Sequence, residues 1–409
     1  MSGAAAARSV ETRASWIVAL AAVAILSVSF GAPLIVVVAL KGIAADLGAP
    51  RALPALASSL AWLGAGAGGI FMGFVAGRAG QRRVAAFGAA MVAAGLALAA
   101  TGKAWALLAG FGLLVGLLGN GALFPPMMAY VSLWFDRRRG TALALVSSGQ
   151  YVAGALWPPL LEGAVERVGW QATMLGFATI VLATVLPLAL LLRPPPALPA
   201  SGGAVAEPGP GGRVLGLPPG LALGLLGLAV FLCCIPMAMP AGHLVAFCSD
   251  LGIAPARGAL MLSVLLGAAF LARQFWGWMA DRIGGLATVL FGNLAQIAGM
   301  AAFLTTQDEA GLFAVSAAYG LGFSGIIPAY VLAVRELFPA AEAHWRVPVV
   351  LCLGLMGMAT GGWLAGALYD AYGSYAVAWQ VGVAVNAAQL ALIGLLVLRR
   401  GRQLQAVVA

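Results

Sequence analysis

The sequence has 409 residues, of which 62% are hydrophobic, only 9% are charged and 56 are glycine. A soluble domain has about a quarter charged residues, so one or two soluble globular domains are excluded. Disorder is excluded too, because it requires low hydrophobicity together with high charge. The net charge of +9 comes without a basic stripe interleaved with aromatic residues, so a nucleic-acid partner is not expected. The composition indicates an integral membrane protein.

Twelve segments are apolar over about 20 residues, the length that crosses a bilayer as a helix. In the first half they are 16–40, 54–76, 84–101, 105–133, 141–161 and 172–192. In the second half they are 217–247, 258–280, 287–305, 312–334, 347–369 and 375–398. The segment between the two sets is rich in Pro, Gly and Ser, as in a flexible linker. We therefore predict an all-α membrane protein with twelve spans, made of an N-terminal bundle (1–192), a linker (193–217) and a C-terminal bundle (218–409).

The cationic residues orient the chain. If the N-terminus is cytoplasmic, sixteen Lys and Arg fall in cytoplasmic segments and five in outer segments, and Arg273 remains within span eight. Cytoplasmic loops carry the excess of positive charge, so both termini are expected inside. The Arg-over-Lys and Ala/Gly bias suits a GC-rich bacterial genome, and the expected location is the cytoplasmic (inner) membrane of a bacterium, in contact with lipid.

One loop pattern occurs in both halves, 204 residues apart. The loop after span two contains Gly73, Gly77, Arg78, Gly80 and Arg82, and the loop after span eight contains Gly277, Asp281, Arg282 and Gly284. Glycine lets helices approach closely, and arginine can pair with a helix C-terminus or a carboxylate. The alternative is that both are ordinary positively charged loops.

Twelve spans, a central linker and a GxxxDR-type loop in each half resemble the major facilitator superfamily over essentially the whole chain. The resemblance implies two pseudo-symmetric six-helix bundles, a central substrate site and the repeated loops as cytoplasmic gates. The first copy departs from the family pattern, because Gly77 stands where the family usually has Asp.

Further segments resemble the monocarboxylate-porter and oxalate/formate-antiporter branch of that superfamily. These are Trp134 to Gly140, Trp157-Pro158-Pro159, Gly169-Trp170-Gln171, His243 to Gly252, and Gly361 to Asp370. Gln171 departs from the Arg that is frequent there. The resemblance implies a small carboxylate substrate.

Arg273 is the strongest site candidate. It lies eight residues before Asp281, or about 12 Å into the helix, which is too deep for easy snorkelling. An intramembrane Arg without a carboxylate partner is costly, and no Asp or Glu lies mid-span. A bound carboxylate would supply the missing anion in bidentate geometry. The branch places a substrate-binding Arg at this position in span eight. The alternative is that Arg273 caps backbone carbonyls or snorkels towards the cytoplasm.

The branch has other charged residues that this chain lacks. Oxalate transporters of the branch pair the span-eight Arg with a Lys in span eleven, but span eleven of this chain (347–369) contains no Lys. Animal monocarboxylate transporters have an Asp one turn before the Arg and a Lys in span one, where this chain has Ala269 and Leu34. A single fixed positive charge favours a monoanion over a dianion, and without that Asp the usual proton relay of the branch is not expected.

Other polar residues in the spans are secondary candidates. His243 titrates near neutrality and could couple protons, or it could be an interfacial residue bonded to backbone. Further candidates for lining the substrate path are Tyr330, Asn120, Tyr130, Tyr151 and Tyr319, with packing as the alternative for each.

No catalytic set, metal-binding spacing, cofactor motif or phosphate-binding loop is present, so neither an enzyme nor ATP-driven transport is predicted. We expect a secondary active transporter of a small organic anion, most simply a monocarboxylate, working as a monomer by proton symport or by anion exchange. The alternatives are a multidrug or lipophilic-compound exporter of the same fold, which would usually need an intramembrane acid, and a transporter-like sensor, which would usually need a larger cytoplasmic domain.

Overall fold

The computed structural model describes residues 11–135, 138–195, 213–339 and 342–408. Its first half contains α1 (Arg13–Val38), α2 (Leu40–Asp46), α3 (Ala52–Ala79), α4 (Gln81–Ala99), α5 (Ala104–Ala109), the π-helix η1 (Gly110–Asn120), α6 (Gly121–Ser132), α7 (Arg139–Ser147) and α8 (Gly149–Ala189). The second half contains α9 (Pro219–Asp250), α10 (Pro255–Ile283), α11 (Gly285–Thr305), α12 (Glu309–Phe323), α13 (Ile326–Leu337), α14 (Ala343–Tyr372) and α15 (Tyr375–Val408).

The helices supply twelve membrane crossings. Eleven helical segments among the described residues are long and apolar enough to span a bilayer. One of them, Thr141–Ala189, has 49 residues, about 74 Å at helical rise and roughly twice the hydrocarbon thickness. Gly169, with φ 79° and ψ 164°, interrupts it and divides it into spans five and six. The prediction of an all-α protein with twelve spans is confirmed.

Two spans are less regular than the apolar pattern predicts. Span four contains the 11-residue π-helix η1, and span ten is divided into α12 and α13 at Ser324 and Gly325. Gly325 packs directly against the Trp276 side chain, so the break brings two helices into close contact. Hydropathy does not distinguish a π-helix or a broken helix from a straight one.

Positive-φ glycines recur at the 204-residue offset of the sequence repeat. Gly80 (φ 83°) and Gly284 (φ 81°) each precede a helix, and Gly48 and Gly252 repeat the correspondence on the opposite side of the bundle. This backbone region favours glycine because it has no Cβ. The two halves are therefore copies of one architecture.

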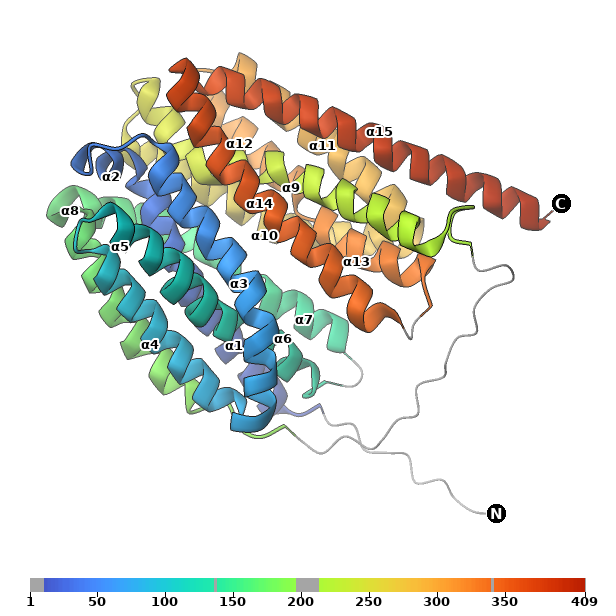
Figure 1. Ribbon diagram of the computed structural model, residues 1–409, viewed down its shortest axis with the longest axis horizontal. Helices are drawn as coiled ribbons and strands as arrows, with labels where there is room; N and C mark the ends of the chain where they lie inside the picture. Colours follow the sequence, from blue (N-terminus) through green and yellow to red (C-terminus); the bar gives the residue numbers. More distant parts are fainter. Residues whose placement is uncertain (1–10, 136–137, 196–212, 340–341, 409) are drawn as a thin grey trace.

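Two hydrophobic cores correspond to the two halves. One core joins residues from Val18 to Leu192, and the other is built mainly of residues from Leu215 to Leu396. Figure 1 shows the two sets of helices side by side. Contacts between the halves involve α8 with α10, α3 with α14, and α1 with α9. Residues 196–212 of the predicted linker lie outside the described part of the chain.

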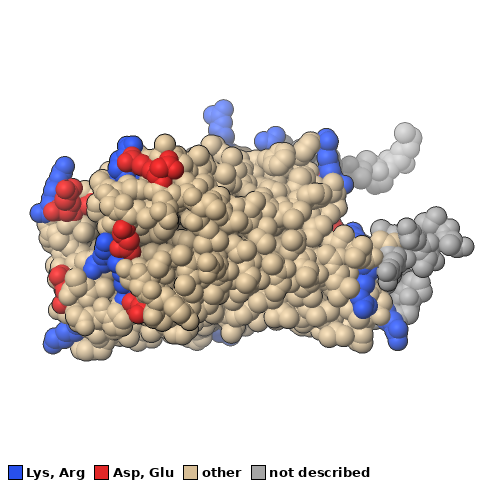
Figure 2. Space-filling model, turned by 90° about the horizontal axis from the view of Figure 1, so that it is seen from above, with Lys and Arg blue, Asp and Glu red and all other residues tan. Residues whose placement is uncertain are grey.

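The two ends of the bundle differ in charge. We call the end where α1 begins and α15 ends the terminus side, and the end carrying α2 the far side (Figure 1). A broad uncharged surface separates the ends in Figure 2; acidic side chains gather at the far side, and the terminus side displays mainly Lys and Arg.

Candidate functional site

Arg273 lies on α10, ten residues before the helix ends at Ile283. Its guanidinium carbon lies 5.1 Å from the centre of the Tyr151 ring on α8, within the range of a cation–π contact. The Nη1 atom is buried and has no hydrogen-bond partner in the part of the chain that the structure describes. Among the described residues, none forms an ion pair with Arg273. A buried guanidinium nitrogen without an acceptor is costly, so the site has an unmet requirement for one.

The Arg273–Tyr151 contact lies at the edge of the interface between the halves. Between this contact and the far side of the bundle, α8 and α10 pack closely. Gly154 lies against the Leu266 side chain, and a Cβ at Gly267 would lie 3.6 Å from Ala155. Tyr151 is buried, and the centre of its ring lies 6.4 Å from the centre of the Phe323 ring in an edge-to-face arrangement. A residue of the first half thus belongs to the hydrophobic core of the second half.

The second interface, α3 with α14, is also closed on the far side. A Cβ at Gly366 would lie 3.0 Å from the Ala52 Cα, and one at Gly362 would lie 3.1 Å from Ser59 Oγ. Nearer the middle, Gly66 meets Leu355. By contrast, a Cβ at Gly73 would meet nothing within 4 Å. Along α3, Gly66 therefore has a close neighbour on α14, whereas Gly73, seven residues further along the helix, has none.

Charged and aromatic residues close the far side. We call this the far-side cluster: Lys41, Arg51, Asp250, Tyr369, Asp370 and Tyr375. The Arg51 guanidinium binds both carboxylate oxygens of Asp250, at 2.5 and 2.8 Å, and lies 3.7 Å from the centre of the Tyr369 ring. Lys41 Nζ binds Asp250 at 2.9 Å.

Asp370 completes the cluster from the second half. Its carboxylate accepts the backbone N–H groups of Arg51 at 2.9 Å and Ala52 at 2.7 Å, and so binds the N-terminus of α3. A carboxylate is favoured there because the first N–H groups of a helix have no intrahelical partner. Burial alone would lower the pKa of Arg51, but hydrogen bonds to Asp250 and Tyr375 raise it. The cation stays charged, and both acids connect the halves.

His243 lies beside the far-side cluster and is almost fully buried on α9. Its Nε2 lies 2.8 Å from the Gly362 carbonyl oxygen, and its Nδ1 lies 2.9 Å from the Tyr375 hydroxyl. A carbonyl only accepts, so Nε2 carries the hydrogen and Nδ1 accepts from Tyr375 in the neutral ring. Both ring nitrogens therefore bond within the protein, one of them to backbone as the sequence alternative expected.

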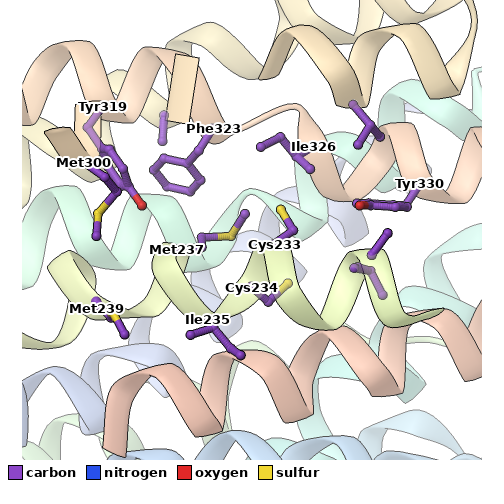
Figure 3. Packing of buried hydrophobic residues seen from close by; sticks show 14 of the residues in the cluster. Cys233, Cys234, Ile235, Met237, Met239, Met300, Tyr319, Phe323, Ile326 and Tyr330 are labelled. Carbon is purple, nitrogen blue, oxygen red and sulfur yellow. The ribbon is translucent and has the colours of Figure 1, made fainter. Parts of the chain in front are cut away.

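Two predicted tyrosines lie in the core of the second half, as Figure 3 shows. Tyr319 donates to the Pro236 carbonyl at 2.9 Å. That carbonyl lacks its usual helical donor because residue 240 is also proline. Tyr330 accepts from Gln389 Nε2 at 2.7 Å. Both side chains are fully buried, and the structure does not bring them to Arg273.

Asn120 and Tyr130 are likewise bonded within the first half. Asn120 Oδ1 accepts from Ser29 Oγ of α1. Tyr130 donates to the Arg193 carbonyl at 2.6 Å, near the terminus-side end of α8. Of the predicted path residues, the structure places only Tyr151 next to Arg273.

The repeated loops lie on the terminus side. A Cβ at Gly73, Gly77, Gly80 or Gly277 would meet nothing within 4 Å. Arg78, Arg82 and Asp281 are exposed, and Arg282 lies over the Trp278 ring at 4.0 Å. Gly284 differs, because Glu336 and Arg400, which pair at 2.5 Å, lie beside it. The four glycines with no neighbour within 4 Å leave room beside these loops on the terminus side.

The far-side cluster is the group that the sequence reasoning missed. Asp250 and Asp370 lie in segments that resemble the transporter branch, and Arg51 is one of the five cations expected in outer segments. The available signal is the scarcity of charge elsewhere. In a chain with so few charged residues, an Asp at the end of a span is expected to pair with a cation. Among the described residues, no group of three His, Cys, Asp or Glu is placed to bind a metal ion.

Comparison with known proteins agrees with this architecture. Mouse monocarboxylate transporter 11 is 28% identical over 381 residues, covering 90% of this chain and 83% of the relative. Bovine monocarboxylate transporter 13 is 28% identical over 279 residues, covering 65% of this chain and 63% of the relative, less than two thirds of its length.

Solved structures show the same fold at low identity. A peptide transporter POT in complex with sulfate superposes with a TM-score of 0.73 at 16% identity, covering 95% of this chain and 94% of that one. An inward-facing bacterial homolog of the human lysosomal transporter Spinster gives 0.68 at 14% identity, covering 95% and 96%. The sequence model of the Major Facilitator Superfamily matches residues 17–241, more than half of the chain. With its twelve spans and two matching halves, the chain belongs to the Major Facilitator Superfamily.

Proposed function

We propose that this transporter carries a small organic anion, most simply a monocarboxylate, and that Arg273 binds the carboxylate. The observation that carries the proposal is the buried Nη1 of Arg273, which has no acceptor among the described residues. A substrate carboxylate at this position would accept two parallel N–H bonds and neutralise the charge. The names of the mammalian relatives point to the same substrate class.

The position of Arg273 supports this role. The guanidinium faces Tyr151 of the other half, at the edge of the interface between the halves. A ligand bound here contacts both halves, as alternating access requires of a central site. Tyr151 supplies an aromatic wall and a hydroxyl, so we assign it to the site and assign Tyr319, Tyr330, Asn120 and Tyr130 to packing.

Charge number favours a monoanion. The other described Lys and Arg lie near the ends of helices or in the turns between them, so Arg273 is the single cation deep within a span. A dianion would bring one negative charge in excess of what this site neutralises, in surroundings where an unpaired charge is costly.

The orientation follows from charge. Loops on the terminus side carry the excess of Lys and Arg, so we propose that this side is cytoplasmic, with both termini inside a bacterial inner membrane. The far-side cluster then closes the outer side, and the open space beside Gly73 and Gly277 supports a conformation open toward the cytoplasm. The loops around Gly73 and Gly277 would close the cytoplasmic side in the alternate conformation.

Uptake into proteoliposomes tests the proposal directly. Labelled lactate, pyruvate, formate and oxalate are supplied to the wild type, to Arg273→Ala and to Arg257→Ala as a matched control. Arg257 is on the same helix but exposed and paired with Glu309. We expect saturable uptake of a monocarboxylate that Arg273→Ala loses and Arg257→Ala keeps. Normal uptake by Arg273→Ala would remove the basis of the proposal.

The same vesicles separate the two modes of coupling. Proton symport makes the external medium more alkaline during uptake, whereas anion exchange requires a second anion inside and leaves the external pH unchanged. The substrate itself can carry the proton, so a carboxylate on the protein is not required for symport.

A further inference from the structure

We propose that His243 is a proton-binding site that controls the far-side cluster: protonation of its ring weakens the contact between the halves and favours opening of the far side. The statement that the far side faces outward rests on the orientation proposed above. The link between His243 and opening rests on the contacts of the imidazole alone and needs no substrate.

Each ring nitrogen of His243 binds a group that touches the other half. Nε2 binds the carbonyl of Gly362, and Gly362 faces Ser59 of α3, 3.1 Å from the position of a Cβ. Nδ1 binds the hydroxyl of Tyr375, and that oxygen accepts from Arg51 Nη1 at 3.4 Å. His243 thus connects through one intermediate to each of two places where the halves meet.

The hydrogen bonds define a direction in the neutral state. Arg51 Nη1 donates to the Tyr375 oxygen, the Tyr375 hydroxyl donates to His243 Nδ1, and His243 Nε2 donates to the Gly362 carbonyl. Arginine is always a donor and a carbonyl is always an acceptor, so both ends of this chain have fixed roles. Only the neutral ring satisfies every member.

Protonation places a hydrogen on Nδ1 and breaks this order. The Tyr375 oxygen then faces donors from both His243 and Arg51, and its own hydrogen loses its acceptor. The new positive charge also lies near Arg51. The partly compensating acid is Asp370, whose two oxygens already accept from the Arg51 and Ala52 amides.

The remaining charges of the far-side cluster are already paired. Asp250 binds both Arg51 and Lys41, and Tyr369 lies under the Arg51 guanidinium. A buried imidazolium is therefore short of counter-charge and of water. Opening the far side would hydrate the ring, so the protonated form favours the open conformation.

Accessibility of an introduced thiol tests this without any substrate. Ser59→Cys is introduced into a variant in which the four native cysteines are replaced by Ser or Ala; these are Cys233, Cys234, Cys248 and Cys352. Ser59 is buried against α14, so a thiol there reacts with a membrane-impermeant maleimide only when the far side opens. The comparison variant is His243→Gln, whose amide can donate to Gly362 and accept from Tyr375 but takes up no proton.

The measured quantity is the alkylation rate of the protein that retains His243 divided by that of the His243→Gln variant. Both rates are taken at one external pH, which cancels the pH dependence of the thiol. We expect a ratio near one at about pH 8 that rises at least about threefold by about pH 5, since the hydrated imidazole of the open conformation titrates between these values. A ratio of one throughout would overturn the proposal. Gel filtration confirms that both proteins are folded.

Tyr375→Phe gives a second, independent comparison. It keeps the aromatic ring between Tyr369 and Trp379 but removes the hydroxyl between His243 and Arg51. We expect the pH response to shrink, and an undiminished response would contradict the proposed route. If no organic anion is transported, the proposed function is wrong. The alkylation results still test the role of His243, because the assay uses no substrate.

Discussion

The guanidinium carbon of Arg273 lies 5.1 Å from the centre of the Tyr151 ring, and the two residues come from different halves of the protein. The cation–π contact holds the guanidinium at the interface, and none of the described residues supplies an acceptor for its buried Nη1. A ligand that binds Arg273 is therefore placed against both halves.

The fork geometry of Arg273 can be separated from its charge. Arg273→Lys keeps the charge but loses bidentate binding of a carboxylate. We expect the KM for a monocarboxylate to rise about tenfold or more, as loss of a charge-assisted bond costs about 1.5–3 kcal/mol. Arg273→Ala should abolish uptake. Equal KM values for Arg273→Lys and wild type would contradict bidentate binding.

Tyr151 is expected to act mainly through its ring. In Tyr151→Phe the cation–π contact is kept, so the KM should stay within about twofold of wild type, whereas Tyr151→Ala should lose about 0.5–2 kcal/mol of anion affinity. Ligand affinity measured by thermal shift distinguishes the two variants. If Tyr151→Phe is as defective as Tyr151→Ala, the hydroxyl binds substrate directly.

The place of Arg273 within a span could be predicted from the sequence, whereas the far-side cluster could not, and the reason is physical. An arginine within an apolar segment is recognisable from its neighbours alone. Arg51 and Asp250 are 199 residues apart, and their pairing exists only after the two halves assemble. Sequence reasoning could see the charges at the span ends but not which of them meet.

The tyrosines illustrate a second limit. Hydropathy shows that a hydroxyl lies within a span but not which way it points. Tyr319 donates to the Pro236 carbonyl, which has no helical donor because residue 240 is proline, and Tyr130 donates to the Arg193 carbonyl. Both hydroxyls therefore bind backbone oxygens. The turn at Gly169 was predictable, because Gly-Trp interrupts an apolar run that is too long for one span.

Neutralising Asp250 should loosen the far side. Asp250→Asn removes the carboxylate that binds Arg51 and Lys41, so the equilibrium shifts toward the conformation open on that side. The alkylation rate of Ser59→Cys should rise at all pH values. Glu309→Gln is the matched control, because Glu309 pairs with Arg257 inside the second half. An equal rise in both variants would indicate general destabilisation.

Removing the Tyr319 hydroxyl should lower stability and leave substrate affinity unchanged. Tyr319→Phe leaves the buried Pro236 carbonyl without a donor, which costs about 1–3 kcal/mol. A lower melting temperature in detergent is expected, with the KM of wild type. Tyr372→Phe, at an exposed tyrosine, should change neither. A raised KM in Tyr319→Phe would return this residue to the substrate path.

Bulk at Gly73 should impair transport without impairing folding. A Cβ there meets nothing within 4 Å, so Gly73→Leu is compatible with this conformation. If the terminus side closes around the loop, the leucine blocks that closure, and uptake should fall sharply while the melting temperature is retained. Gly394→Leu also enters open space, on α15, and should transport normally. Normal uptake by Gly73→Leu would show that α3 needs no close approach at this position, and the gate would then have to close elsewhere along the helix.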